Sequence, residues 1–539
     1  MAADSVSRPP LRLEPSAPGG PALVEWLAAD AAVRDRGLAD GRHTVAYAET
    51  AELLARLEAE LARRGVGREH PVALECSQSV AGALAILYVL SREHDVVLLP
   101  ELAEASKEAG TPRFIPSFCR HVVTARAGAG ARDGGAGGGG AAGAGSAAGS
   151  PLDGIAVEAN PGFVEEPAAA PRSGGADLYL RTSGSTGVPK LARMPHQKWL
   201  NNALPCVERW RLTAGDRLAV PVPIFHSYGF GAAFLPGLLA GASMDLGSGG
   251  NILRYLEREE RFAPDVAFLT PALCETFVAV RKTPRPYRLS VTAGDRIKPE
   301  TVAAFEPRFG PLLNLYGSAE MGAVSAPAPD DPPAARLGTA GYALAGIELR
   351  VVTEGADDAD AENGAAEAAA PVAPEIGGRL QCRQRNGFTG YLIQDGRWRF
   401  EPRGEDGWFE TGDLARFRDG GYLEIRGRSG LSVKRDGLLV VFADVEAAIE
   451  KVPGVQRAVV VAEGEGRRGS RLLACCLVER PADGPRPEAV RQACFERLPR
   501  YAVPDFVAIV ESLPRLPSGK IDRRAVRDQL AGRAASPSP

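Results

Sequence analysis

The sequence predicts an α/β protein. We expect a large N-terminal domain of doubly wound parallel sheets with a small barrel-like subdomain, and a mobile, smaller α+β C-terminal domain. Three observations lead to this prediction. Apolar strand-like runs alternate with helical runs along most of the chain, its 539 residues are enough for several cores, and a new βα series begins after residue 428.

The alternation begins near the N-terminus. Residues 51–64 repeat leucine at helical spacing. Residues 71–76 and 95–100 have the composition of buried strands and flank a helical run at 79–91, which favours parallel pairing. The same rhythm predicts further strands and helices at 217–222, 229 onward, 265–270, 271–280, 288–294, 299–309 and 312–317.

Two segments interrupt this rhythm. Residues from about 125 to 150 are almost all alanine and glycine, and residues from about 354 to 375 are acidic and rich in alanine. Both have too few packing side chains to offset the entropy of ordering, so we expect disordered insertions. We place the domains at 13–428 and 429–533, with a hinge near Gly430.

Composition restricts the function to small-molecule chemistry. The net charge of −4 provides no basic excess for nucleic acid, and no run approaches the ~20 apolar residues of a membrane span. The eight cysteines are scattered, mostly in apolar runs, without the spacing of a metal site. A cytoplasmic location without a signal peptide is therefore expected.

The stretch LYLRTSGSTGVPK, at 178–190, predicts a strand followed by an anion-binding loop. Backbone N–H groups, hydroxyls and the Lys190 ammonium could converge there on phosphate. The spacing of a Walker loop is absent, and no Ser or Thr follows the lysine. Taken alone, such a loop is more often a plain turn.

Three further stretches follow in order: NLYGSAEMG at 314–322, GWFETGDLARFRDGGYLEIRGR at 407–428 and LPRLPSGKIDR at 513–523. Together with the loop they resemble the core motifs of the adenylate-forming superfamily, which contains acyl- and aryl-CoA synthetases, nonribosomal adenylation domains and luciferases. The resemblance extends from about Leu23 to Leu530. It implies ATP-dependent activation of a carboxylic acid with Mg²⁺, followed by transfer to CoA or to the phosphopantetheine thiol of a carrier protein.

The resemblance also assigns roles to individual residues. It implies that the leaving phosphates are held by a loop made of Thr182, Ser183, Gly184, Ser185, Thr186, Gly187 and Lys190. It implies an adenine site made of Gly294, Asp295, Asn314, Tyr316 and Gly317. Asp413 and Arg428 would bind the ribose, Glu320 would act in catalysis as the Mg²⁺ ligand, and Lys520 would bridge the carboxylate and the α-phosphate. The thiol step would use a hinge at Gly430 and close approach of the pantetheine arm at Gly437.

The substrate is a carboxylic acid whose identity the sequence leaves open. PIFHSYGFG places His226 at the expected carboxylate entrance, beside Phe225, Tyr228, Phe230 and Phe234 as apolar lining. Relatives that activate α-amino acids usually carry an aspartate in this element, so its absence favours an acid without an α-ammonium group.

Three alternatives stay open. An amino-acid adenylating enzyme would require another acidic group in the pocket, such as Asp245. A nucleotide-binding scaffold with impaired catalysis is possible because Ala319 replaces the family's threonine and Gly430 replaces its usual Asp or Lys. A light-emitting oxygenase would require oxidation of the adenylate.

Overall fold

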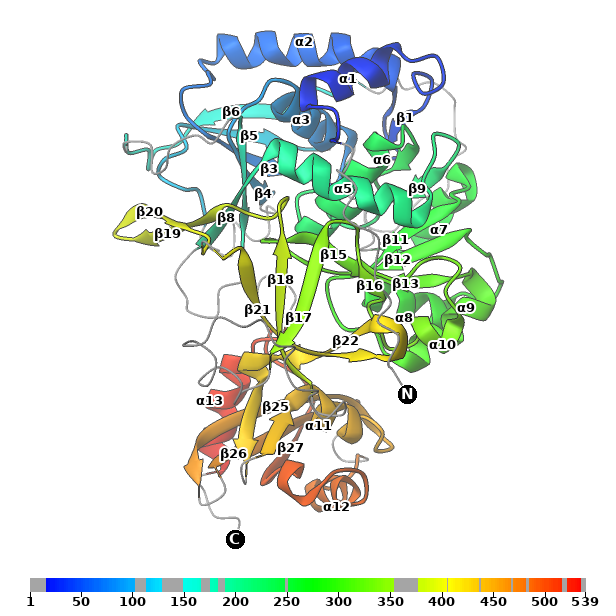
Figure 1. The fold of residues 1–539 in the computed structure, drawn as a ribbon, viewed down its shortest axis with the longest axis vertical. Coiled ribbons are helices and arrows are strands. Elements are labelled where there is room, and N and C mark those ends of the chain that lie inside the picture. Colours follow the sequence, from blue (N-terminus) through cyan, green and yellow to red (C-terminus); the bar gives the residue numbers. More distant parts are fainter. Residues whose placement is uncertain are drawn as a thin grey trace, which may run out of the picture. The chain divides into compact units, whose positions relative to one another are not determined.

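The computed structural model describes residues 16–101, 113–127, 149–165, 175–182, 190–247, 251–352, 377–404, 406–435, 438–466, 469–480, 484–515 and 521–534 (Figure 1). Most of the two predicted insertions lies outside these residues. The chain divides into two compact units. The larger comprises Met1–Leu349, Cys382–Phe409 and Gly421–Leu423, and the smaller comprises Arg350–Gln381, Glu410–Gly420 and Glu424–Pro539.

The first sheet of the larger unit has seven strands. Their order is β13 (Leu312–Asn314), β12 (Leu289–Thr292), β11 (Val266–Leu269), β9 (Arg217–Ala219), β10 (Ser243–Asp245), β1 (Gly37–Ala39) and β2 (Thr44–Ala46). All neighbours except β1 and β2 pair in parallel. One face packs against α7 (Ile252–Phe262), α8 (Pro271–Val280) and α9 (Pro299–Phe309), through side chains such as Phe277 and Phe305.

The second sheet has eight strands. Their order is β20 (Arg397–Pro402), β19 (Gly390–Asp395), β8 (Lys190–Pro195), β7 (Asp177–Arg181), β4 (Val96–Pro100), β3 (Val72–Cys76), β5 (His121–Ala125) and β6 (Ile155–Ala159). The central strands β5, β3, β4 and β7 are parallel. One core joins the inner faces of both sheets to α1 (Gly20–Ala29), α2 (Tyr47–Arg63), α3 (Val80–Ser91), α5 (His196–Trp210) and α6 (Leu235–Leu239).

The predicted elements lie where the sequence placed them, with one difference of type. The helix expected from Gly229 begins as a π-helix, η1 (Tyr228–Phe234), which α6 continues. Gly231 allows this turn to pack closely, since a Cβ there would lie 2.5 Å from the Trp199 ring. Extra-residue turns of this kind are frequent at functional sites.

Two smaller sheets complete the central part of the chain. β14 (Tyr316–Ser318), β15 (Gly322–Ala326) and β16 (Tyr342–Ala343) are antiparallel. A four-stranded sheet has the order β17 (Ile347–Val352), β18 (Gly378–Gln384), β21 (Trp408–Arg418) and β22 (Tyr422–Arg428). The division between the two units passes through these four strands, so the boundary after residue 428 stays a prediction.

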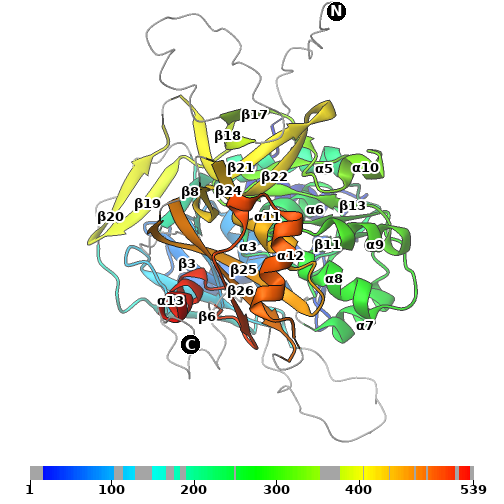
Figure 2. The same ribbon diagram turned by 90° about the horizontal axis from the view of Figure 1, so that it is seen from below.

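The C-terminal part of the smaller unit is a sheet of β24 (Leu438–Val441), β23 (Ser432–Arg435), β26 (Gly469–Val478), β25 (Val455–Gly466) and β27 (Phe506–Val510). Alternate residues of β25 pack on opposite faces. Ala458 and Val460 belong to a core cluster with residues of α11 (Phe442–Ile449) and α12 (Pro487–Arg497), whereas Val459 and Val461 belong to one with residues of α13 (Arg523–Ala534). Helices therefore cover both faces of this sheet (Figure 2), and the predicted α/β class with a separate C-terminal domain is confirmed.

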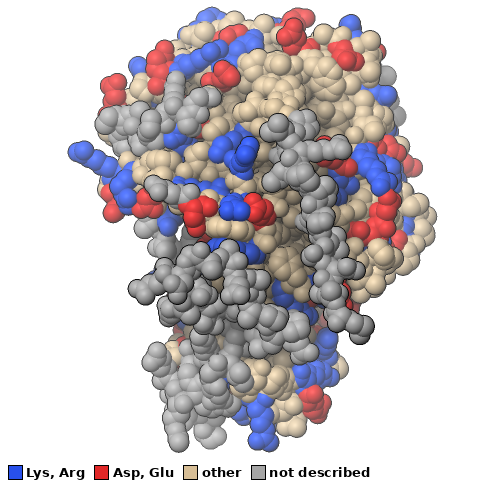
Figure 3. All heavy atoms as spheres, in the orientation of Figure 1, with Lys and Arg blue, Asp and Glu red and all other residues tan. Residues whose placement is uncertain are grey.

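Charge and cysteine usage agree with the composition. Basic and acidic side chains are interspersed on the face drawn in Figure 3. All eight cysteines are free and buried. Among the described residues, no helix has the length and apolar character that crossing a membrane requires.

Candidate active site

The base of the predicted phosphate loop is formed by Thr182 and Lys190. The N–H of Thr182 donates to the Lys190 carbonyl over 3.0 Å, where the antiparallel strands β7 and β8 end and begin. The intervening Ser183, Gly184, Ser185, Thr186 and Gly187 lie outside the described residues. The two ends of the loop are therefore joined, and its role in binding phosphate stays a prediction.

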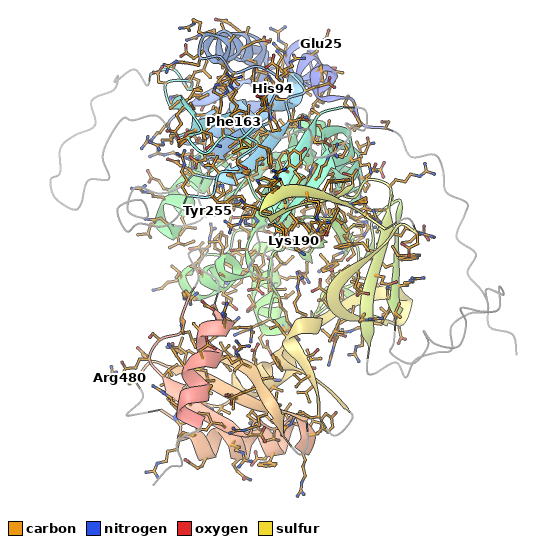
Figure 4. All side chains as sticks on the ribbon, turned by 90° about the vertical axis from the view of Figure 1, so that its left-hand side faces the viewer. Glu25, His94, Phe163, Lys190, Tyr255 and Arg480 are labelled. Carbon is orange, nitrogen blue, oxygen red and sulfur yellow. The ribbon has the colours of Figure 1, made fainter. Side chains whose placement is uncertain are left out.

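Glu320 and Lys190 are brought to one aromatic side chain, Tyr391. The Tyr391 hydroxyl donates to Oε1 of Glu320 over 3.0 Å, and the Lys190 Nζ lies 5.7 Å from the Tyr391 ring centroid. Pairing of β19 with β8 sets this geometry, with Ile393 opposite Lys190. Figure 4 shows Lys190 beside the yellow ribbon of this part of the chain. A cationic and an anionic group thus lie near one tyrosine, the first by its ring and the second at its hydroxyl.

The environment of Tyr391 keeps its hydroxyl protonated. Burial, followed by the nearby Glu320 carboxylate, raises the pKa of Tyr391 well above its usual value. The backbone also holds Glu320, because the N–H of Phe388 donates to its carbonyl over 2.7 Å. Tyr391 was not predicted from the sequence, since no motif contains it and it lies 71 positions from Glu320.

Glu320 would provide only part of the coordination of a Mg²⁺ ion. Among the described residues, no group of three His, Cys, Asp or Glu side chains could hold a metal ion. Mg²⁺ is usually bound by one or two carboxylates together with substrate phosphates and water. Glu320 fits that chemistry, because among the described residues only Oε1 of its carboxylate accepts a hydrogen bond, from Tyr391, and carboxylate oxygens suit a hard cation.

The predicted adenine residues follow the carboxyl ends of two neighbouring parallel strands, β12 and β13. Gly294 has φ +91°, in the left-handed region that favours glycine. Asp295 is exposed, and the Asn314 amide donates to the Thr339 carbonyl over 3.0 Å. In open α/β sheets, ligands bind at the carboxyl ends of strands, so both loops lie at the edge where a nucleotide is expected.

Tyr316 and Gly317 lie at an irregularity in the pairing of β14 with β15. Tyr316 is half-buried and packs against the main core. A Cβ on residue 317 would lie 2.3 Å from the Gly322 carbonyl oxygen, so only glycine fits there. The close approach of these two strands fixes the backbone that carries the Tyr316 ring.

His226 lies on the loop between β9 and η1. The residue is exposed. Its backbone N–H donates to the Pro223 carbonyl over 3.1 Å, and its backbone carbonyl accepts from the N–H of Phe230 over 2.8 Å. The Tyr228 hydroxyl lies 2.8 Å from the Val291 carbonyl, at the same edge of the sheet.

The apolar side chains near His226 divide into two groups. Phe230 and Phe234 are 0% exposed and belong to the core, which is a correction to their predicted role as pocket lining. The helical turn of η1 points them inward. Phe225 and Tyr228 are only partly buried and keep their place beside His226.

Asp413 and Arg428, in the smaller unit, form an ion pair. Arg428 Nε lies 2.8 Å from Oδ1 of Asp413, whose side chain is 7% exposed while that of Arg428 is 57% exposed. The Asp413 N–H donates to the Thr411 hydroxyl over 3.1 Å, and Gly412 has φ +72°. The carboxylate is therefore buried at the turn, and the arginine lies on its solvent side.

The remaining predicted residues belong to the thiol step and to Lys520. Gly430 is exposed, and a Cβ there would have no atom within 4 Å. Glycine is therefore not required at residue 430 for space. Gly437 and Lys520 lie outside the described residues.

Asp245, considered as an acidic group for an α-ammonium substrate, is already neutralised. It is 7% exposed, and the Arg258 guanidinium binds both of its carboxylate oxygens. Ala319 is partly buried against the core.

Comparison with known proteins identifies the family. A profile described as AMP-binding enzyme matches residues 147–392, and one described as AMP-binding enzyme C-terminal domain matches residues 444–520. ATP-bound MatB from Rhodopseudomonas palustris superposes with a TM-score of 0.71 at 20% identity, covering 95% of this chain and 99% of that chain. This similarity confirms the fold.

Curated relatives include enzymes that act on aromatic and on fatty acids. The chain is 30% identical to a salicylyl-CoA synthase / salicylate adenylyltransferase from Streptomyces sp, over 68% of this chain and 65% of that protein. It is 28% identical to the medium-chain fatty-acid–CoA ligase of Escherichia coli (strain K12), over 66% and 61%. It is 26% identical to the 3-hydroxybenzoate–CoA ligase of Aromatoleum sp. (strain CIB), over 95% and 96%.

The chain spans less than two thirds of the length of the first two of these relatives. The two profiles, the curated relatives and the fold nevertheless agree with the four motifs and their order. The chain belongs to the AMP-binding enzyme family of the adenylate-forming superfamily.

Proposed function

We propose that this protein is an AMP-forming acid–thiol ligase. It joins a carboxylic acid to AMP at the expense of ATP and passes the acyl group to a thiol. The observation that carries the proposal is the placement of Glu320 at the Tyr391 hydroxyl and of Lys190 5.7 Å from the centroid of the same ring, because a triphosphate with its metal needs both a carboxylate and a cation.

The first step forms a bond between a carboxylate oxygen and the α-phosphorus. Pyrophosphate leaves with the electron pair of the broken P–O bond. Thr182 and Lys190, with the loop between them, hold the departing phosphates. Glu320 would hold Mg²⁺, which when bound would supply positive charge to the leaving group. Lys520 bridges the carboxylate and the α-phosphate.

The second step breaks the mixed anhydride. The sulfur of the thiol attacks the acyl carbon, and AMP leaves with one of the original carboxylate oxygens. The ribose is held by Asp413, whose buried carboxylate can accept from both hydroxyls of a diol. Arg428 steadies this carboxylate, and the adenine lies between the Gly294–Asp295 turn and Tyr316.

The acid is proposed to be an aryl or acyl acid without an α-ammonium group. An ammonium needs a carboxylate partner when it is desolvated, and the Asp245 carboxylate is engaged by Arg258. Two of the relatives reported above carry the names of enzymes for hydroxylated benzoic acids. His226 then stands at the entrance for the carboxylate.

The acceptor is CoA or the phosphopantetheine arm of a carrier protein, and both offer the same thiol. A relative from Mycobacterium tuberculosis is named salicyl-AMP ligase / salicyl-S-ArCP synthetase, which keeps the carrier protein within the proposal. A cytoplasmic location, where ATP and CoA are supplied together, is part of the same proposal.

The test is ATP–pyrophosphate exchange in the absence of any thiol, with separate pools of aryl, fatty and α-amino acids. The proposal predicts exchange that depends on an aryl or fatty acid. Exchange only with α-amino acids would contradict the assigned acid class. Binding of ATP without exchange for any pool would instead favour a nucleotide-binding scaffold with impaired catalysis.

A further inference from the structure

The segment Val220–Ile224, which leads to His226, cannot complete a regular strand. The Val220 N–H still donates to the Asp245 carbonyl over 2.8 Å, as the last bond of the ladder. Pro221 and Pro223 then have no N–H to donate. The carbonyl of Val220 and the N–H of Ile224 therefore need hydrogen-bond partners outside the ladder. Val220 and Ile224 are both 0% exposed, so water does not supply these partners.

One side chain supplies both partners. Gln78 Nε2 donates to the Val220 carbonyl over 2.6 Å, and Gln78 Oε1 accepts from the Ile224 N–H over 2.9 Å. The amide of Gln78 therefore bonds both ends of the proline-containing segment, as a peptide group of a neighbouring strand would do. Buried backbone groups that lose such a partner are costly.

Gln78 is itself fixed by the fold. It follows β3, in the eight-stranded sheet, and precedes Ser79, whose hydroxyl accepts from the Gly82 N–H as the N-terminal cap of α3. The segment that Gln78 holds follows β9, in the seven-stranded sheet. The glutamine thus connects the carboxyl ends of strands from two different sheets, inside the larger unit.

The geometry of His226 depends on this segment. Its N–H is bonded to the Pro223 carbonyl, one residue before Ile224. On the other side, a Cβ on Gly229 would lie 2.0 Å from the same Pro223 oxygen, so the start of η1 presses against the segment. A shift of Val220–Ile224 would therefore move the backbone that carries His226.

We propose that Gln78 is a positioning residue for the carboxylate-binding step, acting through the Val220–Ile224 segment on His226. This inference rests on the proposed function, in which His226 stands at the carboxylate entrance. Gln78 touches no reacting atom. Its role is to hold the imidazole where the incoming carboxylate meets it, because small displacements of a positioning group cost much of its catalytic effect.

The variant that tests this role is Gln78→Met, which keeps the length of the side chain and removes both hydrogen bonds. Gln78→Glu is the second variant. It keeps an acceptor for the Ile224 N–H but loses the donor to Val220, and it can be tested if the methionine variant does not fold. Gln197→Met is the matched control, because the Gln197 amide also makes two bonds, to the Ala17 carbonyl over 2.8 Å and to Asn201 over 3.1 Å.

Three measurements are made on the full chain: the steady-state kinetics of acid-dependent ATP–pyrophosphate exchange, thermal unfolding, and amide hydrogen exchange over residues 220–228. In Gln78→Met we expect kcat/KM for the acid to fall at least tenfold while the KM for ATP stays within twofold. We also expect the amide hydrogen of Ile224 to exchange with solvent faster than in the wild type. Gln78→Glu should lie between Gln78→Met and the wild type, and Gln197→Met should behave as the wild type does.

A double-mutant cycle with His226→Ala separates positioning from general destabilisation. If Gln78 acts through His226, adding Gln78→Met to His226→Ala changes kcat/KM for the acid by less than twofold. Full additivity of the two effects, or equal losses in Gln78→Met and Gln197→Met, would overturn the inference. A wild-type protein without any acid-dependent pyrophosphate exchange would contradict the proposed function instead. In that case, faster hydrogen exchange of the Ile224 amide in Gln78→Met would still show that Gln78 holds the segment.

Discussion

The Tyr391 hydroxyl donates a hydrogen bond of 3.0 Å to Oε1 of Glu320, between residues that are 71 positions apart in the chain. The bond connects strand β19 to the turn that follows β14. It orients the carboxylate to which the family resemblance assigns a metal-binding role. The same ring has the Lys190 ammonium near it, so one aromatic residue arranges both charges that a metal–triphosphate requires.

Replacement of this hydroxyl is the first prediction. Tyr391→Phe keeps the ring beside Lys190 and removes the bond to Glu320, which as a bond to a charged group contributes about 1.5 kcal/mol. We expect kcat for pyrophosphate exchange to fall about tenfold. Tyr422→Phe is the control, because its hydroxyl also donates to a carboxylate, Asp331, over 3.1 Å. Equal rates in the two variants would contradict the role of Tyr391.

The second prediction concerns nucleotide binding. Asp413→Asn removes the charge that Arg428 faces and one acceptor for a ribose hydroxyl. We expect the KM for ATP to rise about tenfold, the effect of roughly 1.4 kcal/mol of lost binding. The control is Asp505→Asn, since Asp505 pairs with Arg435 over 2.8 Å elsewhere in the same unit. An unchanged KM for ATP in Asp413→Asn would remove this residue from the ribose site.

The third prediction separates the two half-reactions. Lys520→Ala should abolish acid-dependent pyrophosphate exchange, because the proposed lysine neutralises charge as the adenylate forms. Transfer from a supplied acyl-adenylate to the thiol should continue at a rate close to that of the wild type. The measurement follows thioester formation from synthetic acyl-adenylate. Equal loss of both reactions would show that Lys520 does not act in the first step alone.

The fourth prediction follows from a buried histidine outside the site. His196 is 5% exposed, and among the described residues neither of its ring nitrogens has a hydrogen-bond partner. Burial, with a smaller contribution from His94, lowers the pKa of His196 to about 3. An unfolded histidine titrates near 6.5. The unfolded chain therefore binds the extra proton between about pH 6.5 and pH 3, so stability rises with pH in this window and is lost as pH falls.

Replacement of this histidine tests the sign of the effect. The free energy of unfolding, measured with denaturant, should fall less steeply with falling pH in His196→Leu than in the wild type. The difference in slope is up to about 1.4 kcal/mol for each pH unit between 6 and 4. His226→Leu is the control, because its side chain is exposed. The same pH dependence in His196→Leu and in the wild type would contradict the buried, neutral state of His196.

The fold could be predicted because its buried strands have simple patterns. The helices predicted at 271–280 and 299–309 have the bounds of α8 and α9, since Pro begins both and an apolar stripe runs through each. Strands β3 and β4 lie within the predicted runs, because parallel strands covered on both faces are continuously apolar.

The site could be predicted only where a motif contains its residues. Glu320, Asp413 and Arg428 are candidates because motifs contain them, and Arg428 Nε lies 2.8 Å from Oδ1 of Asp413. Tyr391 and Gln78 were missed, because their roles arise from tertiary contacts that no local spacing encodes. Phe230 and Phe234 were predicted to line the pocket, but the π-helical turn directs them into the core.

Activation of the acid as an adenylate can be followed with an isotope. The protein is given ATP, the thiol and the acid that supports exchange, with both carboxylate oxygens labelled with ¹⁸O, and the products are analysed by mass spectrometry. We expect each AMP to carry one ¹⁸O atom, because a carboxylate oxygen bonds to the α-phosphorus before the thiol attacks. Label in inorganic phosphate together with ADP, or unlabelled AMP, would contradict it.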